Sequence, residues 1–166
     1  MARASMRTKR CRRCRRKRAL SQFSPSRRSK DDPGGFYAWC RRCASGYQRD
    51  MYRTLEGQLA HRVRAAKTRS KRFGIPFDLD LSHLCLLWDA QKGRCALSGL
   101  PFALDDGAKG KQAFRPSLDR IKPEMGYTRD NVRLVATIVN FGINKWGYDA
   151  FLQVCRAVAR KKRTRI

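Results

Sequence analysis

The chain has 166 residues, of which 39 are lysine or arginine and 13 are aspartate or glutamate, so its formal charge is +26 at pH 7. A magnitude of about 2 to 8 is enough to keep a small domain in solution, so this excess indicates a polyanionic partner. No apolar run approaches the roughly 18 residues of a membrane-spanning helix. We therefore expect a soluble intracellular protein whose partner is a nucleic acid and not a membrane.

The N-terminal stretch is rich in arginine and poor in acidic residues, a composition also found in organelle transit peptides. It contains Cys11 and Cys14, which are part of a regularly spaced set of four cysteines. That spacing favours a folded segment over a transit peptide.

Four of the seven cysteines form two Cys-x-x-Cys pairs, Cys11/Cys14 and Cys40/Cys43, with 25 residues between the pairs. Each pair places two thiolates on one tight turn, and Zn²⁺ prefers four such ligands in a tetrahedron. Disulfides and unrelated free thiols are the alternatives, which the absence of a secretory signal and the paired spacing disfavour. The pattern predicts a structural zinc site in a zinc ribbon-like module over residues 1–49.

Aromatic residues between the two pairs predict a small core around the metal: Phe23, Phe36, Tyr37 and Trp39. The remaining cysteines follow no metal-binding spacing. We expect Cys85, Cys95 and Cys155 to be small buried hydrophobic residues.

An apolar stripe at helical spacing predicts a helix from about Asp50 to Phe73, ended by Gly74. The stripe consists of Leu55, Leu59, Val63 and Ala66. The remaining faces are basic, and we expect this linker helix, over residues 50–76, to contact a phosphate backbone. A solvated charged face is the alternative. The basic residues assigned to phosphate contact are Arg62, Lys67, Lys71 and Arg72.

Residues 77–79 alternate like a short strand, and Ser82 is placed to cap a helix that ends near Gly93. A turn leading into a strand is expected over residues 95–104, followed by a loop rich in glycine and lysine over 105–112.

Two further strands are predicted at residues 116–121 and 131–135, separated by a turn. Thr137, Asn140 and Asn144 then recur at spacings of three and four, which aligns them on one face of a helix. Asp119 on the first strand and Asn140 on the helix can supply two oxygen ligands to one divalent cation. Mg²⁺ suits such a site, because it keeps several waters and binds substrate phosphate oxygens.

The segments CALSG, SLDRI, GYTRDNV and VNFGINK resemble an HNH (ββα-metal, His-Me finger) endonuclease over residues 95–146. With the four-cysteine module in front, the chain is similar to the recombination endonuclease VII-like proteins of phages. The resemblance implies Asp119 and Asn140 as metal ligands and Asn131 as an amide that braces the strand and turn. It also implies Asn144 or Lys145 as substrate-facing groups, DNA as the substrate, and a bacterial or phage-infected cytoplasm.

The family's general-base histidine falls at Arg120, whose guanidinium, with a pKa above about 12, cannot accept a proton from water near neutral pH. Arg120 either clamps the scissile phosphate and stabilises developing charge, or marks a site that binds DNA without cutting it. Lys145 follows Asn140 by five positions, where three is usual.

Many relatives also carry two further cysteine pairs. Their places here are taken by Cys95/Ser98 and Ala136/Val139, so we expect apolar packing where those relatives bind zinc.

A final helix is predicted from about Tyr148 to Arg160, packed on the preceding residues through an apolar stripe of Phe151, Val154, Cys155 and Val158. The basic run that ends it, with Lys161 and Lys162, exceeds what the helix dipole requires and is expected to contact phosphate.

The sequence as a whole predicts an α+β chain with a zinc module (1–49), a basic linker helix (50–76) and an HNH-type domain (77–166). The expected function is Mg²⁺-dependent DNA cleavage, with Zn²⁺ as a structural cofactor. Two alternatives remain: a catalytically inactive HNH-like protein that binds DNA, and a zinc-bearing protein that binds RNA.

Overall fold

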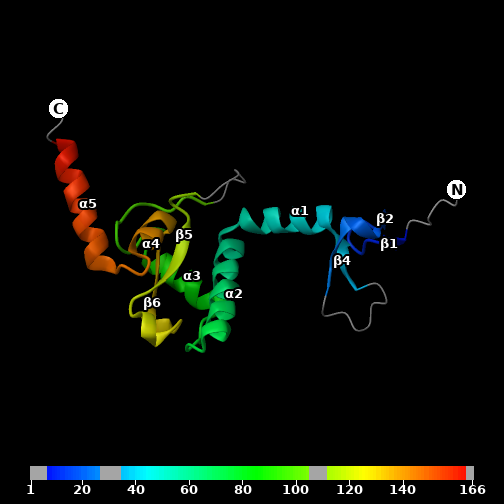
Figure 1. Cartoon of the computed structure of the whole chain (residues 1–166), viewed down its shortest axis with the longest axis horizontal. Helices are drawn as coiled ribbons and strands as arrows, with labels where there is room; N and C mark the ends of the chain where they lie inside the picture. The colour runs from blue at the N-terminus through cyan, green and yellow to red at the C-terminus, as the bar shows by residue number, and fades with distance from the viewer. Residues whose placement is uncertain (1–6, 27–34, 105–111, 164–166) are drawn as a thin grey trace. The chain divides into compact units, whose positions relative to one another are not determined.

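The computed structural model describes residues 7–26, 35–104 and 112–163, with the side chains of the last two residues excluded. The protein is α+β and divides into two compact units, one that ends at Met51 and one that begins at Tyr52 (Figure 1). In the described ranges, no helix combines the length and the apolar character needed to cross a membrane.

The first unit contains two antiparallel hairpins. β1 (Thr8–Arg10) pairs with β2 (Lys17–Ala19), and β3 (Phe23–Pro25) pairs with β4 (Phe36–Cys40). The single-turn helix η1 (Leu20–Gln22) links the two hairpins.

The helix α1 (Arg41–Tyr52) follows directly on β4. The first cysteine pair lies in the turn between β1 and β2. The second pair spans the last residue of β4 and the first turn of α1. The prediction that each cysteine pair lies in a tight turn is therefore confirmed for the first pair. The second pair lies instead at the start of a helix.

The core of the first unit is small and gathers at the cysteines. Cys11, Phe23 and Cys40 are buried together, and Phe36 and Trp39 pack against them. Tyr37 was expected in this core but is exposed.

The helix expected from 50 to 73 is broken. α1 ends at Tyr52, and a new helix, α2, spans Leu55–Phe73. Thr54 has an extended backbone (φ −99°) and caps α2, because its Oγ1 accepts a hydrogen bond from the Gly57 amide at 3.1 Å. Such N-caps satisfy amides that have no partner inside the helix. The predicted C-terminus is confirmed, because Gly74 adopts the left-handed conformation (φ 64°) and its amide bonds to the Ser70 carbonyl.

The predicted apolar stripe of α2 is confirmed. Leu59 and Ala66 are buried in the main core of the second unit, and Leu55 and Val63 pack against it. The helix predicted as a linker over 50–76 therefore contributes to this core, and the boundary between the units falls before it.

The segment after α2 contains fewer strands than expected. α3 (Leu81–Ala90) is capped by Asp80 and not by Ser82, because Asp80 Oδ1 accepts from the His83 amide at 2.7 Å. At 77–79 and 95–104 the described residues form only the isolated bridges Phe77 to Tyr127 and Arg94 to Pro101.

The bridge at Phe77 depends on Gly126. Its φ is 72°, and a Cβ there would lie 2.5 Å from the Pro76 carbonyl oxygen. Only glycine permits both this conformation and this close approach. The turn that precedes Tyr127 is thereby held against residues 76–78.

The predicted strand, turn, strand and helix over 116–143 are present. β5 (Pro116–Arg120) pairs antiparallel with β6 (Val132–Ala136), with Asp119 opposite Arg133. The connection contains η2 (Pro123–Met125) and η3 (Arg129–Asn131), and α4 (Thr137–Ile143) follows β6.

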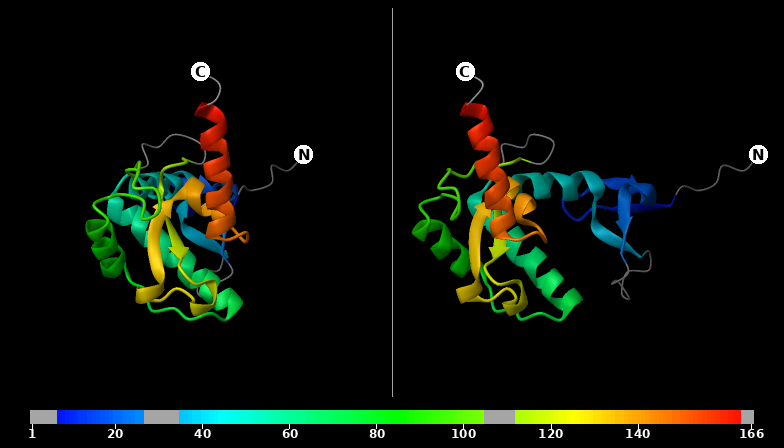
Figure 2. Two further views of the ribbon diagram at one scale, coloured as in Figure 1. Left: turned by 90° about the vertical axis from the view of Figure 1, so that its left-hand side faces the viewer. Right: turned by 60° about the vertical axis from the view of Figure 1, so that its left-hand side comes forward.

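The two faces of this hairpin are covered by different helices. Leu118 and Leu134 face the core that includes α2 and α3, and Figure 2 shows the yellow β5 and β6 beside the green α2. Val135 on the other face packs with Val139 and Ile143 of α4.

The helix α5 (Tyr148–Arg163) contacts the core between β6 and α4 through Phe151 in its first turn. Phe151 packs on α4 so closely that a Cβ at Gly142 would lie 2.3 Å from its ring. Val154 and Val158 are 61% and 62% exposed, and Cys155 is exposed. The predicted packing of these three residues is wrong, because the helix extends away from α4 after its first turn (Figure 1).

Candidate functional site

The four cysteines of the two pairs form one cluster, as the spacing predicted. The sulfur atoms of Cys11, Cys14, Cys40 and Cys43 all lie within 4.8 Å of one another. Sulfurs around a tetrahedral Zn²⁺ with bonds of about 2.3 Å are separated by about 3.8 Å, so small adjustments suffice. The Cys40 amide donates to Cys11 Sγ at 3.3 Å, which joins the two pairs.

The pKa values of two of these thiols shift in opposite directions. Burial disfavours the Cys11 thiolate, but hydrogen bonds from the amides of Cys14, Cys40 and Arg13 outweigh it and lower its pKa to about 6. Burial, followed by contact with the neighbouring sulfurs, raises the pKa of Cys43 to about 12. Four thiolates therefore coexist here only when a cation compensates their charge. The cluster fits a structural metal ion, and its ligand chemistry is that of zinc.

Asp119 lies near the end of β5 and is buried. Its Oδ2 accepts a hydrogen bond at 2.8 Å from Nε of Arg133, the residue directly opposite on β6. The pair is an ion pair in which both side chains are largely covered. Among the described residues Asp119 Oδ1 has no hydrogen-bond partner, so one carboxylate oxygen is available as a ligand.

Asn140 on α4 reaches the same face of β5. Its Nδ2 donates to Ser117 Oγ at 2.8 Å and to the Leu118 carbonyl at 3.1 Å. A carbonyl can only accept, so these bonds fix which amide atom is the nitrogen. No described residue donates to Asn140 Oδ1. Asn140 therefore lies over the peptide that precedes Asp119 and keeps its oxygen available.

Arg120 points away from these two residues. Side chains alternate along a strand, so Arg120 lies on the face of β5 opposite Asp119. Its guanidinium lies 5.0 Å from the ring centre of Tyr127 and donates to the Pro123 carbonyl at 2.8 Å. Other N–H groups of the same guanidinium remain available for a phosphate.

Asn131 is buried and holds the turn between β5 and β6. Its amide nitrogen donates to the carbonyls of Lys122 and Gly126, at 2.7 and 2.8 Å, and its oxygen accepts from the Lys122 amide at 2.9 Å. These three bonds tie both ends of the turn to one side chain, the geometry expected of a bracing amide.

Asn144 and Lys145 fall beyond the end of α4. The helix ends at Ile143, and Asn144 caps it with a φ of 37°. The expected alignment of Asn144 with Asn140 on one helical face is therefore wrong. Lys145 Nζ lies 4.9 Å from the ring centre of Trp146, and both side chains are exposed.

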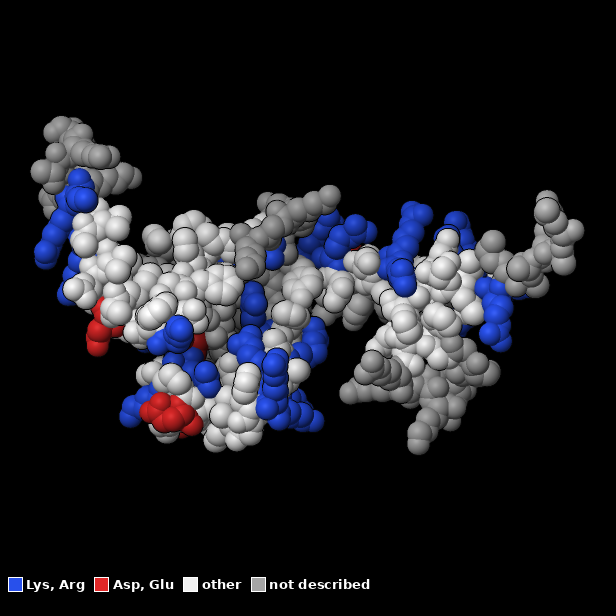
Figure 3. Space-filling view, in the orientation of Figure 1, with Lys and Arg blue, Asp and Glu red and all other residues white. Residues whose placement is uncertain are grey.

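The basic residues assigned to phosphate contact differ in exposure. Lys67, Lys71, Arg72 and Lys161 are exposed. Arg62 is partly buried, and its Nε has no hydrogen-bond partner. The side chain of Lys162 lies outside the described residues. Figure 3 shows lysine and arginine side chains gathered over the region of α2.

Arg62 lies in a region of positive charge. Burial lowers the pKa of its guanidinium, and the charges of Arg115 and Arg69 act in the same direction, against the opposing effect of Tyr52. In the described part of the chain, no carboxylate forms an ion pair with Arg62 or Arg69. Gln58, one turn before Arg62, is buried with both amide atoms unpaired. Arg69 donates to the Tyr127 hydroxyl at 2.9 Å, and guanidinium groups without a carboxylate partner can pair with an anionic ligand.

Arg133, Ser117 and Gln58 were not identified from the sequence. Arg133 and Ser117 become significant only through the register of β5, β6 and α4. The strict alternation of Asn131 to Val135 is the one signal that places Arg133 on the same side of its strand as Val135.

Cys95, Ala136 and Val139 pack together in the core between β6 and α4, as expected from their positions in the motif. Burial disfavours the Cys95 thiolate, but hydrogen bonds from the Ser98 hydroxyl and from three amides outweigh it and lower the pKa. Cys85 is partly buried.

Comparisons of this chain with protein-family models, with curated proteins and with solved structures found no match.

Proposed function

We propose that this protein is a metal-dependent DNA endonuclease of the HNH type. The observation that carries the proposal is the position of Asp119 and Asn140 on one face of β5. Each presents an oxygen without a hydrogen-bond partner among the described residues, and the HNH-like order of strand, turn, strand and helix surrounds them. The formal charge of +26 supports a nucleic acid as the substrate.

The residues at this site fit a hard divalent cation, because carboxylate and amide oxygens are the ligands that Mg²⁺ takes. When bound, such a cation polarises the scissile phosphodiester and stabilises the charge that develops on it. Asn140 orients its oxygen through the two bonds to β5. Arg133 holds the Asp119 carboxylate from the opposite strand, and Asn131 fixes the turn between these strands.

Arginines of α2 and β5 would hold the DNA backbone. Arg62, Arg69 and Arg120 lie on α2 and β5, and Arg69 and Arg120 both approach the ring of Tyr127. Planar guanidinium groups suit phosphate oxygens because their N–H groups bind in pairs. In this proposal Arg120 contacts phosphate and transfers no proton.

Nicking of supercoiled plasmid in the presence of Mg²⁺ tests the proposal. Asp119→Asn removes the charged ligand and keeps the shape, so we expect cleavage to fall by at least about 10²-fold, the effect of deleting one charge-stabilising group, with DNA binding retained. Asp89→Asn, at an exposed aspartate of the same unit, is the matched control. Equal cleavage by both variants would overturn the assignment of Asp119.

A protein that binds DNA without cutting it is the second candidate. Two observations favour it: Arg133 already neutralises the Asp119 carboxylate, and Arg120 faces away from it. In that case neither the native chain nor Asp119→Asn nicks the plasmid, while both bind it equally.

A further inference from the structure

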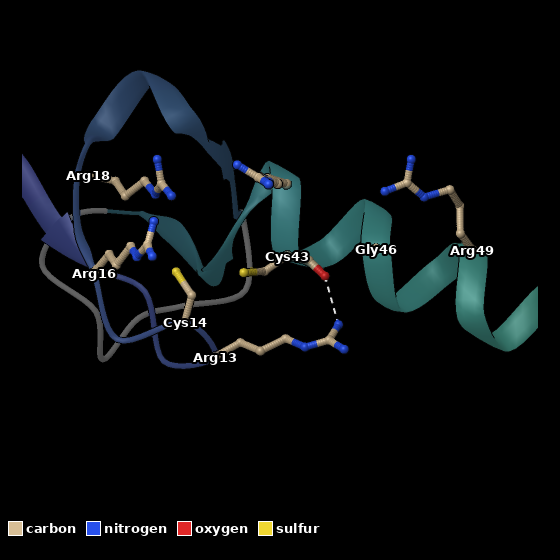
Figure 4. A pocket seen from close by; sticks show the side chains of 8 residues that line it. Arg13, Cys14, Arg16, Arg18, Cys43, Gly46 and Arg49 are labelled. Carbon is tan, nitrogen blue, oxygen red and sulfur yellow. Dashed lines mark hydrogen bonds between the residues drawn. The ribbon is translucent and has the colours of Figure 1, made fainter.

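The first unit contains a basic pocket beside the four cysteines (Figure 4). It has a volume of about 420 Å³ and is open to solvent on one side. Cys14, Cys43 and Gly46 contribute to its wall. The charged lining residues are Arg13, Arg16, Arg18, Arg42 and Arg49.

The arginines reach this pocket from two segments that are distant in sequence. Arg16 and Arg18 lie in the first hairpin, and Arg42 and Arg49 lie on α1. Spacings of four and three place Arg42, Gly46 and Arg49 on one face of α1. A Cβ at Gly46 would meet no atom within 4 Å, so the glycine leaves open space between two guanidinium groups.

The positive charge exceeds what the metal site requires. A divalent cation held by four thiolates leaves two net negative charges, and Asp50 adds one at 3.8 Å from Arg13. Five arginines surround these three charges. The surplus of two positive charges remains to be neutralised by a ligand.

The five arginines differ in their hydrogen-bond partners. Arg13 donates to the Cys43 carbonyl at 2.9 Å, and Arg18 donates to Gln22 Oε1 at 3.4 Å. Arg16, Arg42 and Arg49 are exposed, and none of them forms a side-chain hydrogen bond or ion pair with a described residue. Three free guanidinium groups around one open space form a site for an oxyanion.

We propose that this pocket binds a phosphate of the nucleic-acid backbone, so that the four-cysteine unit is itself a nucleic-acid contact. The inference rests on the nucleic-acid partner of the proposed function and is independent of the cleavage chemistry. The four cysteines come from both segments that carry the arginines, so a metal bound by them would hold these segments together at the pocket.

Binding of the full-length protein to a fluorescent DNA duplex, measured over a range of salt concentrations, tests this inference. The pocket variant is the double substitution Arg42→Gln with Arg49→Gln. The matched control removes the same charge from exposed positions of the same unit, Arg10→Gln with Arg12→Gln. Zinc content is measured for each variant to confirm that the metal site is intact.

We expect the pocket variant to bind at least about tenfold more weakly than the control, because it can no longer form charge-assisted hydrogen bonds to the phosphate. The slope of log K against log salt should also fall by about 0.9, since the variant neutralises one phosphate fewer. Equal weakening in both variants would overturn the proposal and leave the arginines as general surface charge.

A second pair of variants tests the pocket without removing any arginine. Gly46→Glu places a carboxylate in the open space, and Gly46→Gln places a neutral side chain of the same size there. We expect Gly46→Glu to bind DNA at least about tenfold more weakly than Gly46→Gln. Equal affinity would contradict the proposal.

Plasmid nicking with Mg²⁺ is measured in parallel. If the native chain binds DNA through the pocket but does not nick it, the cleavage proposal fails and the pocket stands. If it nicks DNA but the pocket and control variants bind alike, the pocket proposal fails alone. If the native chain binds no nucleic acid, both fail.

Discussion

The unit that ends at Met51 and the unit that begins at Tyr52 hold their turns in place by different means. In the first, the buried residues Cys11, Phe23 and Cys40 lie at the cysteine cluster, so the metal ligands are also most of the core. In the second, aliphatic residues from α2, α3, β5 and β6 pack around Leu134.

The surroundings of Cys95 in the second unit illustrate this difference. Cys95 and Ser98 keep the spacing of a cysteine pair, and the turn still directs amides at the Cys95 sulfur. Ala136 and Val139 pack on Cys95, so hydrocarbon and not further thiols surrounds this sulfur. A small unit buries too little apolar surface to be stable without a metal, whereas a larger one can hold its turns in place by hydrocarbon packing alone.

The largest expected effect is the unfolding of the first unit when its metal is removed. Chelation with EDTA, or Cys40→Ser, should make residues up to Met51 susceptible to proteolysis, because structural zinc contributes about 10 to 16 kcal/mol of binding free energy that is also folding free energy. The second unit should remain protected. Cys155→Ser, at an exposed cysteine, should leave the proteolytic susceptibility of both units unchanged. Survival of the first unit without metal would contradict this comparison.

A core substitution in the second unit should destabilise that unit and leave metal binding by the first unit unchanged. Leu134 is fully buried, and Leu134→Ala should lower the free energy of unfolding of this unit by about 2 to 5 kcal/mol. Chemical denaturation measures this decrease, and metal titration should show unchanged affinity at the first unit. Leu86→Ala, at a 66% exposed position, should cost less than about 0.5 kcal/mol.

A metal site can also be introduced into the second unit by substitution. Ser98→Cys, Ala136→Cys and Val139→Cys together would give Cys95 three thiol neighbours, and we expect the purified protein to hold one additional zinc per chain. Metal analysis gives the stoichiometry. The same variant with Cys95→Ala is the control, since it lacks the fourth ligand. Unchanged zinc content in the first variant would show that packing has closed this position to metal.

The smallest expected effect is the acid sensitivity of the second unit. Burial, followed by the charges of Arg62, Arg64 and Arg69, lowers the pKa of His61. The unfolded chain then takes up this proton more readily than the folded one, so stability falls as pH drops below the ordinary histidine pKa of about 6.5.

His61→Gln should therefore reduce the decrease in unfolding free energy between pH 7 and pH 5. Comparison of the two proteins at pH 8, where the histidine is neutral, corrects for the removal of the imidazole ring that packs edge-on against Tyr52. An identical pH dependence would show that His61 is not a source of the acid sensitivity.

Features that depend on neighbouring residues were predictable. The spacing of the two cysteine pairs predicted the cluster, the stripe through Leu59 and Ala66 predicted the buried face of α2, and Gly74 predicted its end. The expected strand at 95–104 failed because strand pairing requires a partner that the local pattern cannot supply. The sequence did not predict the break at Thr54, because the prediction followed the apolar spacing and did not consider that threonine is a good N-cap residue.

The sequence by itself determined the metal-binding chemistry, the excess of positive charge and the order of elements around Asp119, because each follows from residue type and local spacing. Only the tertiary structure decided that Arg133 pairs with Asp119, that Arg120 faces Tyr127, and that Arg16, Arg42 and Arg49 surround one pocket. Those relations depend on strand register and on contacts between residues distant in the chain, which no local pattern encodes.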